Sequence, residues 1–237
     1  MLLQSMTKYY KHLFFDLDHT LWDFEQSAFH TFQLLFEKYQ LNSRGVPALS
    51  QFIEVYTHQN LILWEAYRNG QLTKEVLSPL RFENTLQIFG IHDRQLAVAI
   101  GDDYLYHSPR MVFLMQGAIE LLDKLLPKYT LHLITNGFEE VQFVKIIEAG
   151  LDKYFSTMTT SEEAGVKKPD IGIFNYALNK ANAQANQSIM IGDNLEVDII
   201  GAKQAGLDQV YYNPLGIEHQ EEISFEIRQL TDLLDYL

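Results

Sequence analysis

The amino-acid sequence predicts an α/β fold, a doubly wound parallel sheet with an all-helical domain inserted into it. Three observations support this prediction. Short apolar runs end abruptly in polar or glycine-containing turns, which is typical of strands buried on both faces of a parallel sheet. Helical patterns alternate with these runs over residues 114–212, as in repeated strand–helix–strand units. A stretch of roughly 90 residues after the first run has helical periodicity and no convincing strand.

The predicted strands come at four places along the chain. They cover residues 11–15, 130–134, 188–191 and 209–212. Helices are predicted over residues 138–148, 172–181 and 195–205, where apolar side chains recur at helical spacing and glycines follow two of the three segments. Elements in this order build a doubly wound, Rossmann-like sheet.

The helical stretch is too long to be a loop. Apolar side chains share one helical face from Phe29 to Tyr39 and another from Phe52 to Tyr67. Ser78-Pro79 predicts the start of a further helix, which Gly90 ends. We therefore expect a helical cap domain over residues 23–110, inserted into an α/β core domain made of residues 1–22 and 111–237.

Composition and charge exclude several classes of protein. The 237 residues are 47% hydrophobic, which is enough for a sizeable core, and 18 basic against 31 acidic side chains leave a net charge of −13. Such a charge repels nucleic-acid polymers and anionic membranes, although a small anionic substrate remains compatible with it. The absence of cysteine excludes disulfides, thiolate nucleophiles and cysteine-bound metals. No targeting segment and no apolar run of about 20 residues stands out, so we expect a cytoplasmic protein.

Polar side chains gather where the predicted strands end, which is where ligands bind in parallel sheets. Asp16 and Asp18 follow the first strand, and Asp193 follows a later one. Converging carboxylates repel one another unless a cation lies among them, and Asp16 with Asp193 would suit Mg²⁺. Asp16 could then attack phosphorus, while Asp18 protonates the leaving oxygen and later activates water.

Three further residues suit the charge of a phosphoryl group. Thr135, the Asn136 amide and the Lys168 ammonium would stabilise its oxygens. Each of these segments alone would be read as an ordinary turn or helix cap. Their occurrence together, in this order and at the ends of different strands, favours a catalytic site.

Four segments of the chain resemble the motifs of the haloacid dehalogenase-like (HAD) hydrolases. These segments are Phe14–Leu21, Ile134–Gly137, Lys168–Asp170 and Gly192–Asp198. The resemblance covers nearly the whole chain and includes the helical C1-type cap that follows the first motif in subfamily I.

The resemblance implies a role for each motif residue. It implies that Asp16 is the nucleophile and that Asp18 is the general acid and base. The implied Mg²⁺ ligands are Asp16, the main-chain carbonyl of Asp18, and Asp193, with Asp198 supporting them. The implied phosphate-binding residues are Thr135, Asn136 and Lys168. His19 departs from the pattern, because the family most often has glycine there, and a contribution to substrate choice is as plausible for it as no role.

Other reactions of the family fit the sequence less well. Metal-free dehalogenases lack the second aspartate of the first motif, so Asp18 argues for phosphoryl transfer. Phosphonate cleavage needs an activated cap lysine, and neither Lys38 nor Lys74 has a visible activating neighbour. For the cap arginines Arg68 and Arg81, we expect ion pairs within the cap.

Within the family, the chain is most similar to the pyrimidine 5′-nucleotidase (YjjG-like) branch. This similarity is carried by Ile134–Phe138, Ser161–Val166 and the segment from Lys168 to Phe174. It implies a Mg²⁺-dependent phosphohydrolase that forms an aspartyl-phosphate and acts on nucleoside 5′-monophosphates. Candidate substrate-facing residues are His19, within the first motif, and Trp22 and Phe24, just past it.

Several alternatives remain open at the level of sequence. One is a sugar-phosphate or phosphoglycolate phosphatase, and a less favoured one is a phosphomutase. A non-catalytic protein that keeps the fold as a scaffold is disfavoured, because none of the chemical residues is replaced.

Overall fold

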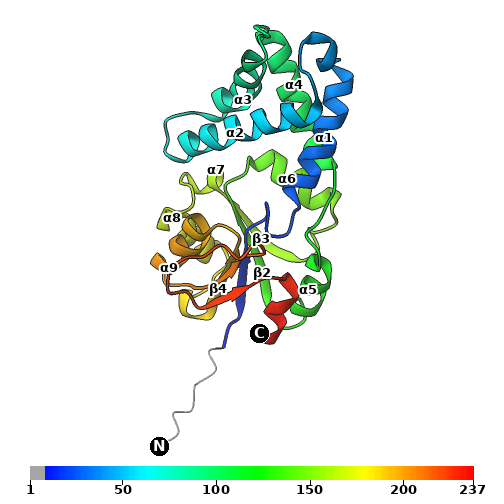
Figure 1. The fold of residues 1–237 in the computed structure, drawn as a ribbon. Helices are drawn as coiled ribbons and strands as arrows, with labels where there is room; N and C mark the ends of the chain where they lie inside the picture. The colour runs from blue at the N-terminus through cyan, green and yellow to red at the C-terminus, as the bar shows by residue number, and fades with distance from the viewer. Residues whose placement is uncertain (1–8) are drawn as a thin grey trace, which may run out of the picture. The chain divides into compact units, whose positions relative to one another are not determined.

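The computed structural model describes residues 9–237, and the centre of its α/β unit is a six-stranded parallel sheet (Figure 1). The strands are β1 (His12–Phe15), β2 (Thr130–Thr135), β3 (Phe155–Thr160), β4 (Ser188–Gly192), β5 (Asp208–Tyr212) and β6 (Phe225–Ile227). Their order in the sheet is β3-β2-β1-β4-β5-β6. The chain thus winds outward from β1 to β3 and then returns beside β1 to begin β4. This reversal creates the switch point at which doubly wound sheets bind ligands.

The register of the central strands brings their carboxyl ends together. Phe15 at the end of β1 lies beside Leu133 of β2 and Ile191 of β4. All five residues of β4 are buried, as expected for a strand covered on both faces. The predicted α/β fold is therefore confirmed, with β1 and β4 at its centre.

Helices cover both faces of the sheet. They are α5 (Ala118–Leu125), α7 (Ser161–Ala164), α8 (Ile171–Lys180), α9 (Gly201–Gln204), the π-helical segment η4 (Leu195–Ile200), and the 3-10 segments η3 (Ala185–Gln187) and η5 (Leu230–Asp235). Phe14 and Met190 of the sheet share a core cluster with Phe174 of α8 and Ala202 of α9. Helix α5 contacts η5 and lies on the opposite side of the sheet from α8 and α9 (Figure 1).

Two of the strands, β3 and β6, were not predicted from the sequence. Strand β3 reads FSTMTT and is only partly buried, so it lacks the apolar run that marks a central strand. Strand β6 has three residues. Both lie at the edges of the sheet, where burial demands less of the sequence.

The helical unit is built from α1 (Phe24–Lys38), α2 (Leu49–Arg68), α3 (Lys74–Ile88) and α4 (Arg94–His107), with short 3-10 segments η1 (Leu41–Arg44) and η2 (Ser108–Arg110). Its core is a cluster of aromatic rings. Phe32 stacks on Tyr104 with ring centroids 5.0 Å apart. It also makes an edge-to-face contact with Tyr56, with ring centroids 4.6 Å apart. Phe32, Phe52 and Tyr56 of the predicted apolar stripes lie in this core. Phe29, with which the α1 stripe was predicted to begin, is instead 47% exposed.

The boundaries of the two units differ from the predicted ones. The helical unit comprises Phe24–Phe113 and also Glu140–Glu148, and the α/β unit comprises the remainder. The second segment belongs to α6 (Glu139–Glu148), which we expected in the α/β domain. Two ion pairs tie α6 to the helical unit, Lys74–Glu140 at 2.6 Å and Arg110–Glu148 at 3.8 Å.

The predicted start of α3 at Ser78-Pro79 is wrong. The helix begins at Lys74, after Thr73, and Pro79 lies inside it. Its missing N–H leaves the carbonyl of Glu75 without its intrahelical donor, a loss confined to the early turns. The helix ends at Ile88, and Gly90 follows with φ of 77°, a left-handed conformation that glycine adopts readily.

Helix length and composition also bear on membranes. Over residues 9–237, no helix combines the length and the apolar character needed to cross a bilayer.

Candidate active site

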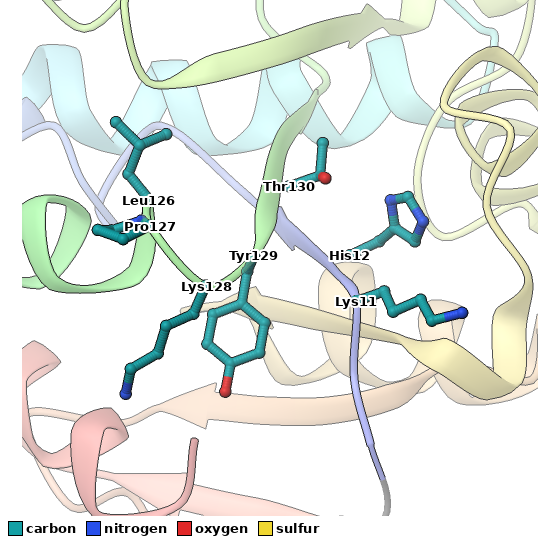
Figure 2. A pocket seen from close by; sticks show the side chains of 7 residues that line it. All are labelled: Lys11, His12, Leu126, Pro127, Lys128, Tyr129 and Thr130. Atoms are coloured by element: carbon teal, nitrogen blue, oxygen red, sulfur yellow. The ribbon is translucent and has the colours of Figure 1, made fainter.

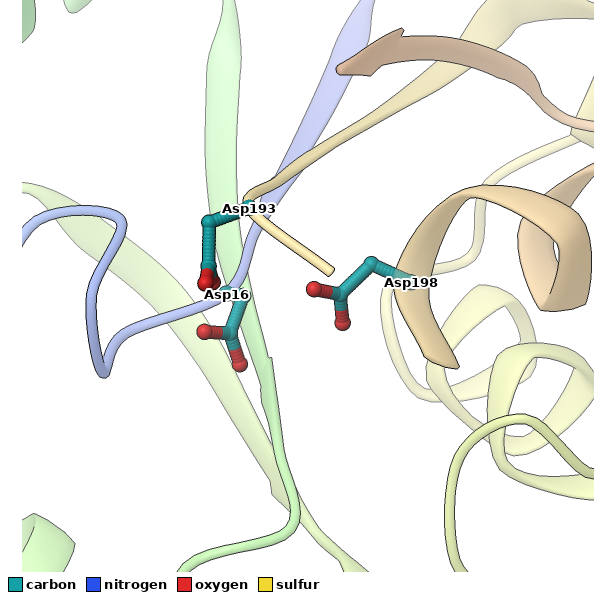
Figure 3. Close-up of side chains that lie close together, drawn as sticks. All are labelled: Asp16, Asp193 and Asp198. Atoms are coloured by element: carbon teal, nitrogen blue, oxygen red, sulfur yellow. The ribbon is translucent and has the colours of Figure 1, made fainter. Parts of the chain in front are cut away.

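Three aspartates meet at the carboxyl ends of β1 and β4 (Figure 3). Asp16 directly follows β1, and its backbone N–H donates to the carbonyl of Ile191 at 2.9 Å. Asp193 directly follows β4, and Asp198 lies on η4. One carboxylate oxygen from each lies within 4.8 Å of the others. Asp16 and Asp193, which the sequence analysis expected at one site, thus lie close together.

Lys168 is the positive charge within this cluster. Its Nζ donates to Asp16 Oδ1 at 2.6 Å, to Asp198 Oδ1 at 2.6 Å and to the carbonyl of Ile134 at 2.9 Å. All three ammonium donors are therefore used, and the residue is only 1% exposed. Lys168 therefore lies within the carboxylate cluster, with its ammonium fully engaged.

Burial and charge shift the ionisation of the cluster. Burial opposes the charged form of Lys168, but the two carboxylates outweigh it and raise the pKa of Lys168. Burial, together with Asp198 and Asp193, raises the pKa of Asp16 despite the opposing effect of Lys168. Burial and Asp198 raise the pKa of Asp193 to about 6. The site therefore carries more negative charge than its own cation balances.

The cluster fits a divalent cation. Three carboxylates and one ammonium leave a formal charge of −3 + 1 = −2. Asp16 Oδ1 and Asp198 Oδ1 are engaged by Lys168, so Asp16 Oδ2 and the Asp193 carboxylate are the oxygens left for a metal. Hard carboxylate oxygens of this kind suit Mg²⁺. Asp18 is not among the clustered carboxylates, consistent with a ligand role limited to its main-chain carbonyl.

Gly192 allows Asp198 to approach the end of β4. A Cβ at position 192 would lie 2.5 Å from Asp198 Oδ2, closer than real atoms come. The same oxygen accepts from the backbone N–H of Asn194 at 3.1 Å. Glycine at this position therefore permits the contact that holds Asp198 against Lys168.

Thr135 is the last residue of β2, and Asn136 directly follows it. The Thr135 hydroxyl accepts from the backbone N–H of Gly137 at 3.0 Å. The Asn136 side chain donates through Nδ2 to the carbonyl of Lys168 at 3.0 Å and accepts at Oδ1 from its N–H at 2.8 Å. Both ends of this amide thus hold the Lys168 backbone. A phosphate contact of Asn136 stays a prediction.

The turn after β1 contains a residue that the sequence analysis missed. The Thr20 hydroxyl donates to Asp193 Oδ1 at 3.2 Å and is fully buried. The signal was present, since Thr20 stands four residues after Asp16 within the first motif. Thr20 therefore orients the carboxylate that the metal prediction needs.

The flanking candidates differ in environment. His19 is half-buried and has φ of 64°, the left-handed conformation that favours glycine and that explains the glycine common in related motifs. Trp22 is fully buried, and its carbonyl accepts from the N–H of His19 at 2.8 Å. Phe24 is half-buried and opens α1 in the helical unit. Their contact with a substrate stays a prediction.

A cavity of about 410 Å³ lies at the opposite end of the sheet, at the starts of β1 and β2 (Figure 2). The cavity is lined by residues 11–12 and 126–130. The side chains of Lys11 and Lys128 point away from one another (Figure 2), so they provide no converging charge for a ligand. The clustered chemistry of the α/β unit therefore lies at the carboxyl ends of its strands.

The fold and the site define an α/β enzyme with its carboxylates gathered at the switch point of the sheet. The family model described as haloacid dehalogenase-like hydrolase matches residues 13–211. The chain therefore belongs to the haloacid dehalogenase-like hydrolases.

Several named proteins have sequences that align with most of this chain. Pyrimidine 5′-nucleotidase PynA of Streptococcus pneumoniae is 31% identical over 97% of this chain and 95% of its own length. Pyrimidine 5′-nucleotidase YjjG of Escherichia coli is 32% identical, covering 90% of both chains. The glyceraldehyde 3-phosphate phosphatase of Pyrococcus furiosus is 32% identical over 96% of this chain and 92% of its own length. The chain is thus similar both to nucleotidases and to a sugar-phosphate phosphatase.

A solved structure supports the fold. The HAD-hydrolase YfnB of Bacillus subtilis, described as bound to magnesium, superimposes with a TM-score of 0.87 at 29% identity. The match covers 96% of this chain and 98% of that chain.

Proposed function

We propose that this enzyme is a Mg²⁺-dependent phosphatase that hydrolyses small phosphate monoesters, with nucleoside 5′-monophosphates as its substrates. The observation that carries the proposal is the buried cluster in which Lys168 holds Asp16 and Asp198 while Asp193 lies alongside. It combines a nucleophile, a fixed cation and oxygens for a metal within one site.

In this mechanism Asp16 attacks the phosphorus. The hydrogen bond from Lys168 Nζ to Asp16 Oδ1 at 2.6 Å fixes the orientation of the attacking carboxylate. The ester P–O bond breaks, the leaving oxygen takes a proton from Asp18, and an aspartyl-phosphate forms on Asp16. Water then attacks this phosphorus while Asp18 accepts its proton, which releases inorganic phosphate and regenerates the Asp16 carboxylate.

Lys168 and Thr135 act on the phosphoryl oxygens. Because the Lys168 ammonium lies 2.6 Å from Asp16 Oδ1, it favours the ionised nucleophile against the opposing effect of burial and brings positive charge beside the developing transition state. The Thr135 hydroxyl accepts from Gly137 and can donate its own proton to a phosphoryl oxygen. Asp16 and Asp193, with the Asp18 carbonyl, would hold Mg²⁺, which when bound neutralises substrate charge.

Nucleotides are favoured by the similarity to two pyrimidine 5′-nucleotidases. His19, Trp22 and Phe24 are the residues we propose for selecting the leaving group. A sugar-phosphate phosphatase is the second candidate, supported by the similarity to a glyceraldehyde 3-phosphate phosphatase.

A phosphate-release screen tests both candidates. Nucleoside monophosphates and sugar phosphates are assayed with Mg²⁺ and with excess chelator. The proposal predicts Mg²⁺-dependent release with the highest kcat/KM for pyrimidine monophosphates. A higher kcat/KM for sugar phosphates would replace the substrate class, and absence of Mg²⁺-dependent release from every ester would reject the function. Asp16→Asn serves as the inactive control.

A further inference from the structure

A second cavity of the α/β unit, of about 490 Å³, runs along η4 and α9. Its other walls are Pro169 and residues 219–221, and every lining residue belongs to the α/β unit. Its volume falls within the range of small-molecule sites, about 300–1,000 Å³. This cavity, which we call the η4 groove, therefore has room for a small ligand.

The η4 groove has an apolar part. Leu195 and Ile200 of η4 line it and are only half-buried, and Pro169 beside them is exposed. Apolar surface of this kind gains free energy when a ligand removes it from water. Hydrocarbon is the ligand chemistry that suits these three side chains.

The charge of the groove is negative. Glu196 and Glu221 line it, and no lysine or arginine does. Neither carboxylate forms an ion pair with a side chain of residues 9–237. Lys203 of α9 does not line the groove, and its ammonium donates instead to the carbonyl of Glu222 at 2.5 Å.

His219 in the lining does not balance this charge. Its Nδ1 accepts from the backbone N–H of Glu221 at 3.2 Å, and its Nε2 lies 3.2 Å from Glu226 Oε2. A ring that accepts at Nδ1 and donates at Nε2 is the neutral tautomer. The two lining carboxylates thus leave a formal charge of −2 beside the apolar wall.

We propose that the η4 groove binds an aliphatic diamine, with its hydrocarbon chain on Leu195 and Ile200 and its two ammonium groups toward Glu196 and Glu221. A diamine of this kind matches both the charge of −2 and the apolar surface. A divalent metal ion would meet the carboxylates alone and leave the apolar side chains exposed to water.

The groove adjoins the two segments that hold the carboxylate cluster. Pro169 follows Lys168, and η4 carries Asp198, which lies 2.6 Å from the Lys168 ammonium. The segments are in close contact, since a Cβ at Gly201 would lie 3.0 Å from the Pro169 carbonyl oxygen. A ligand that touches both should therefore slow local opening of η4.

The first test measures binding without any substrate. The melting temperature is recorded in rising concentrations of 1,3-diaminopropane, 1,4-diaminobutane, 1,5-diaminopentane and 1,6-diaminohexane, with sodium chloride at equal ionic strength as the reference. Butylamine tests the need for the second ammonium. We expect at least one diamine to stabilise the wild type beyond the salt reference, at a half-saturating concentration at least threefold below that of butylamine.

Glutamine variants place the ligand in the groove. Glu196→Gln and Glu221→Gln should each raise the half-saturating diamine concentration at least threefold, and the two together at least tenfold. Glu222→Gln is the matched control, because it removes the same charge one residue beyond the lining. It should keep the wild-type response.

Hydrogen exchange followed by mass spectrometry gives an independent readout. Bound diamine should slow exchange in residues 195–204 and 219–221. The proposal is overturned if no diamine stabilises the wild type beyond salt, if E196Q and E221Q respond as E222Q does, or if the protection lies outside these residues. Because no phosphate ester is used, a phosphatase that fails this test keeps its proposed function, and a protein inactive on every ester can still pass it.

Discussion

Replacing Lys168 by methionine tests how the buried cluster holds together. The substitution keeps most of the unbranched side chain and removes an ammonium that makes three hydrogen bonds, at 2.6, 2.6 and 2.9 Å. The formal charge of the cluster then falls from −2 to −3. Breaking a buried ion pair from one side costs about 3–5 kcal/mol, because the remaining carboxylates lose their partner.

The expected loss in the free energy of unfolding is therefore about 3–5 kcal/mol for K168M. With about 2–4 °C per kcal/mol for a protein of this size, the melting temperature should fall by roughly 6–20 °C. Urea denaturation followed by circular dichroism and a thermal scan measure both quantities. Lys124→Met is the control, because Lys124 forms an exposed pair with Glu120 at 2.6 Å, whose loss costs at most about 0.5 kcal/mol.

A double variant separates charge from packing. Adding Asp198→Asn to K168M removes one uncompensated carboxylate and should restore part of the lost stability. If K168M unfolds within about 1 kcal/mol of the wild type, the cluster is not the buried, coupled unit described above and the reasoning fails.

Three further predictions concern the nucleophile, the glycine beside it and a buried histidine. Asp16→Asn should abolish phosphate release while circular dichroism stays that of the wild type; near-normal turnover would reject Asp16 as nucleophile. Gly192→Ala places a Cβ 2.5 Å from Asp198 Oδ2 and should cost about 1–3 kcal/mol in urea denaturation, and an unchanged midpoint would contradict the crowding. Burial, followed by the effect of His12, lowers the pKa of His132 to about 4, so the unfolded state binds the proton first as pH falls. The free energy of unfolding is therefore unaffected by His132 above pH 6.5. It falls by at most about 3 kcal/mol as the pH drops toward 4. His132→Phe should flatten the dependence of unfolding free energy on pH in this window, and an unchanged slope would refute the assignment.

The sequence predicted the centre of the fold better than its edges. Strands β1 and β4 are buried on both faces, so their apolar runs were visible, whereas β3 and β6 at the sheet edges left no such pattern. The start of α3 was misplaced because proline commonly marks a first turn, while here Thr73 precedes the helix and Pro79 lies within it.

The site was predictable where its residues stand directly after strands. Asp16 and Asp193 share an edge because neighbouring parallel strands end together. The double clamp of Asn136 on the Lys168 backbone was not predictable, because it joins two loops whose distance depends on tertiary structure. The partners of Arg81 were equally hidden: we expected an ion pair, whereas among residues 9–237 its guanidinium donates to Tyr56 and Asn60 and forms no ion pair.

The central claim is that the carboxylate of Asp16 captures phosphorus, and chemical trapping tests it most directly. Enzyme in steady turnover is quenched with borohydride, which reduces an acyl phosphate to an alcohol, and its peptides are sequenced by mass spectrometry. The account predicts homoserine at position 16, formed only when both phosphate ester and Mg²⁺ were present. Reduction at Asp18 in place of Asp16, or no reduction during confirmed turnover, would contradict it.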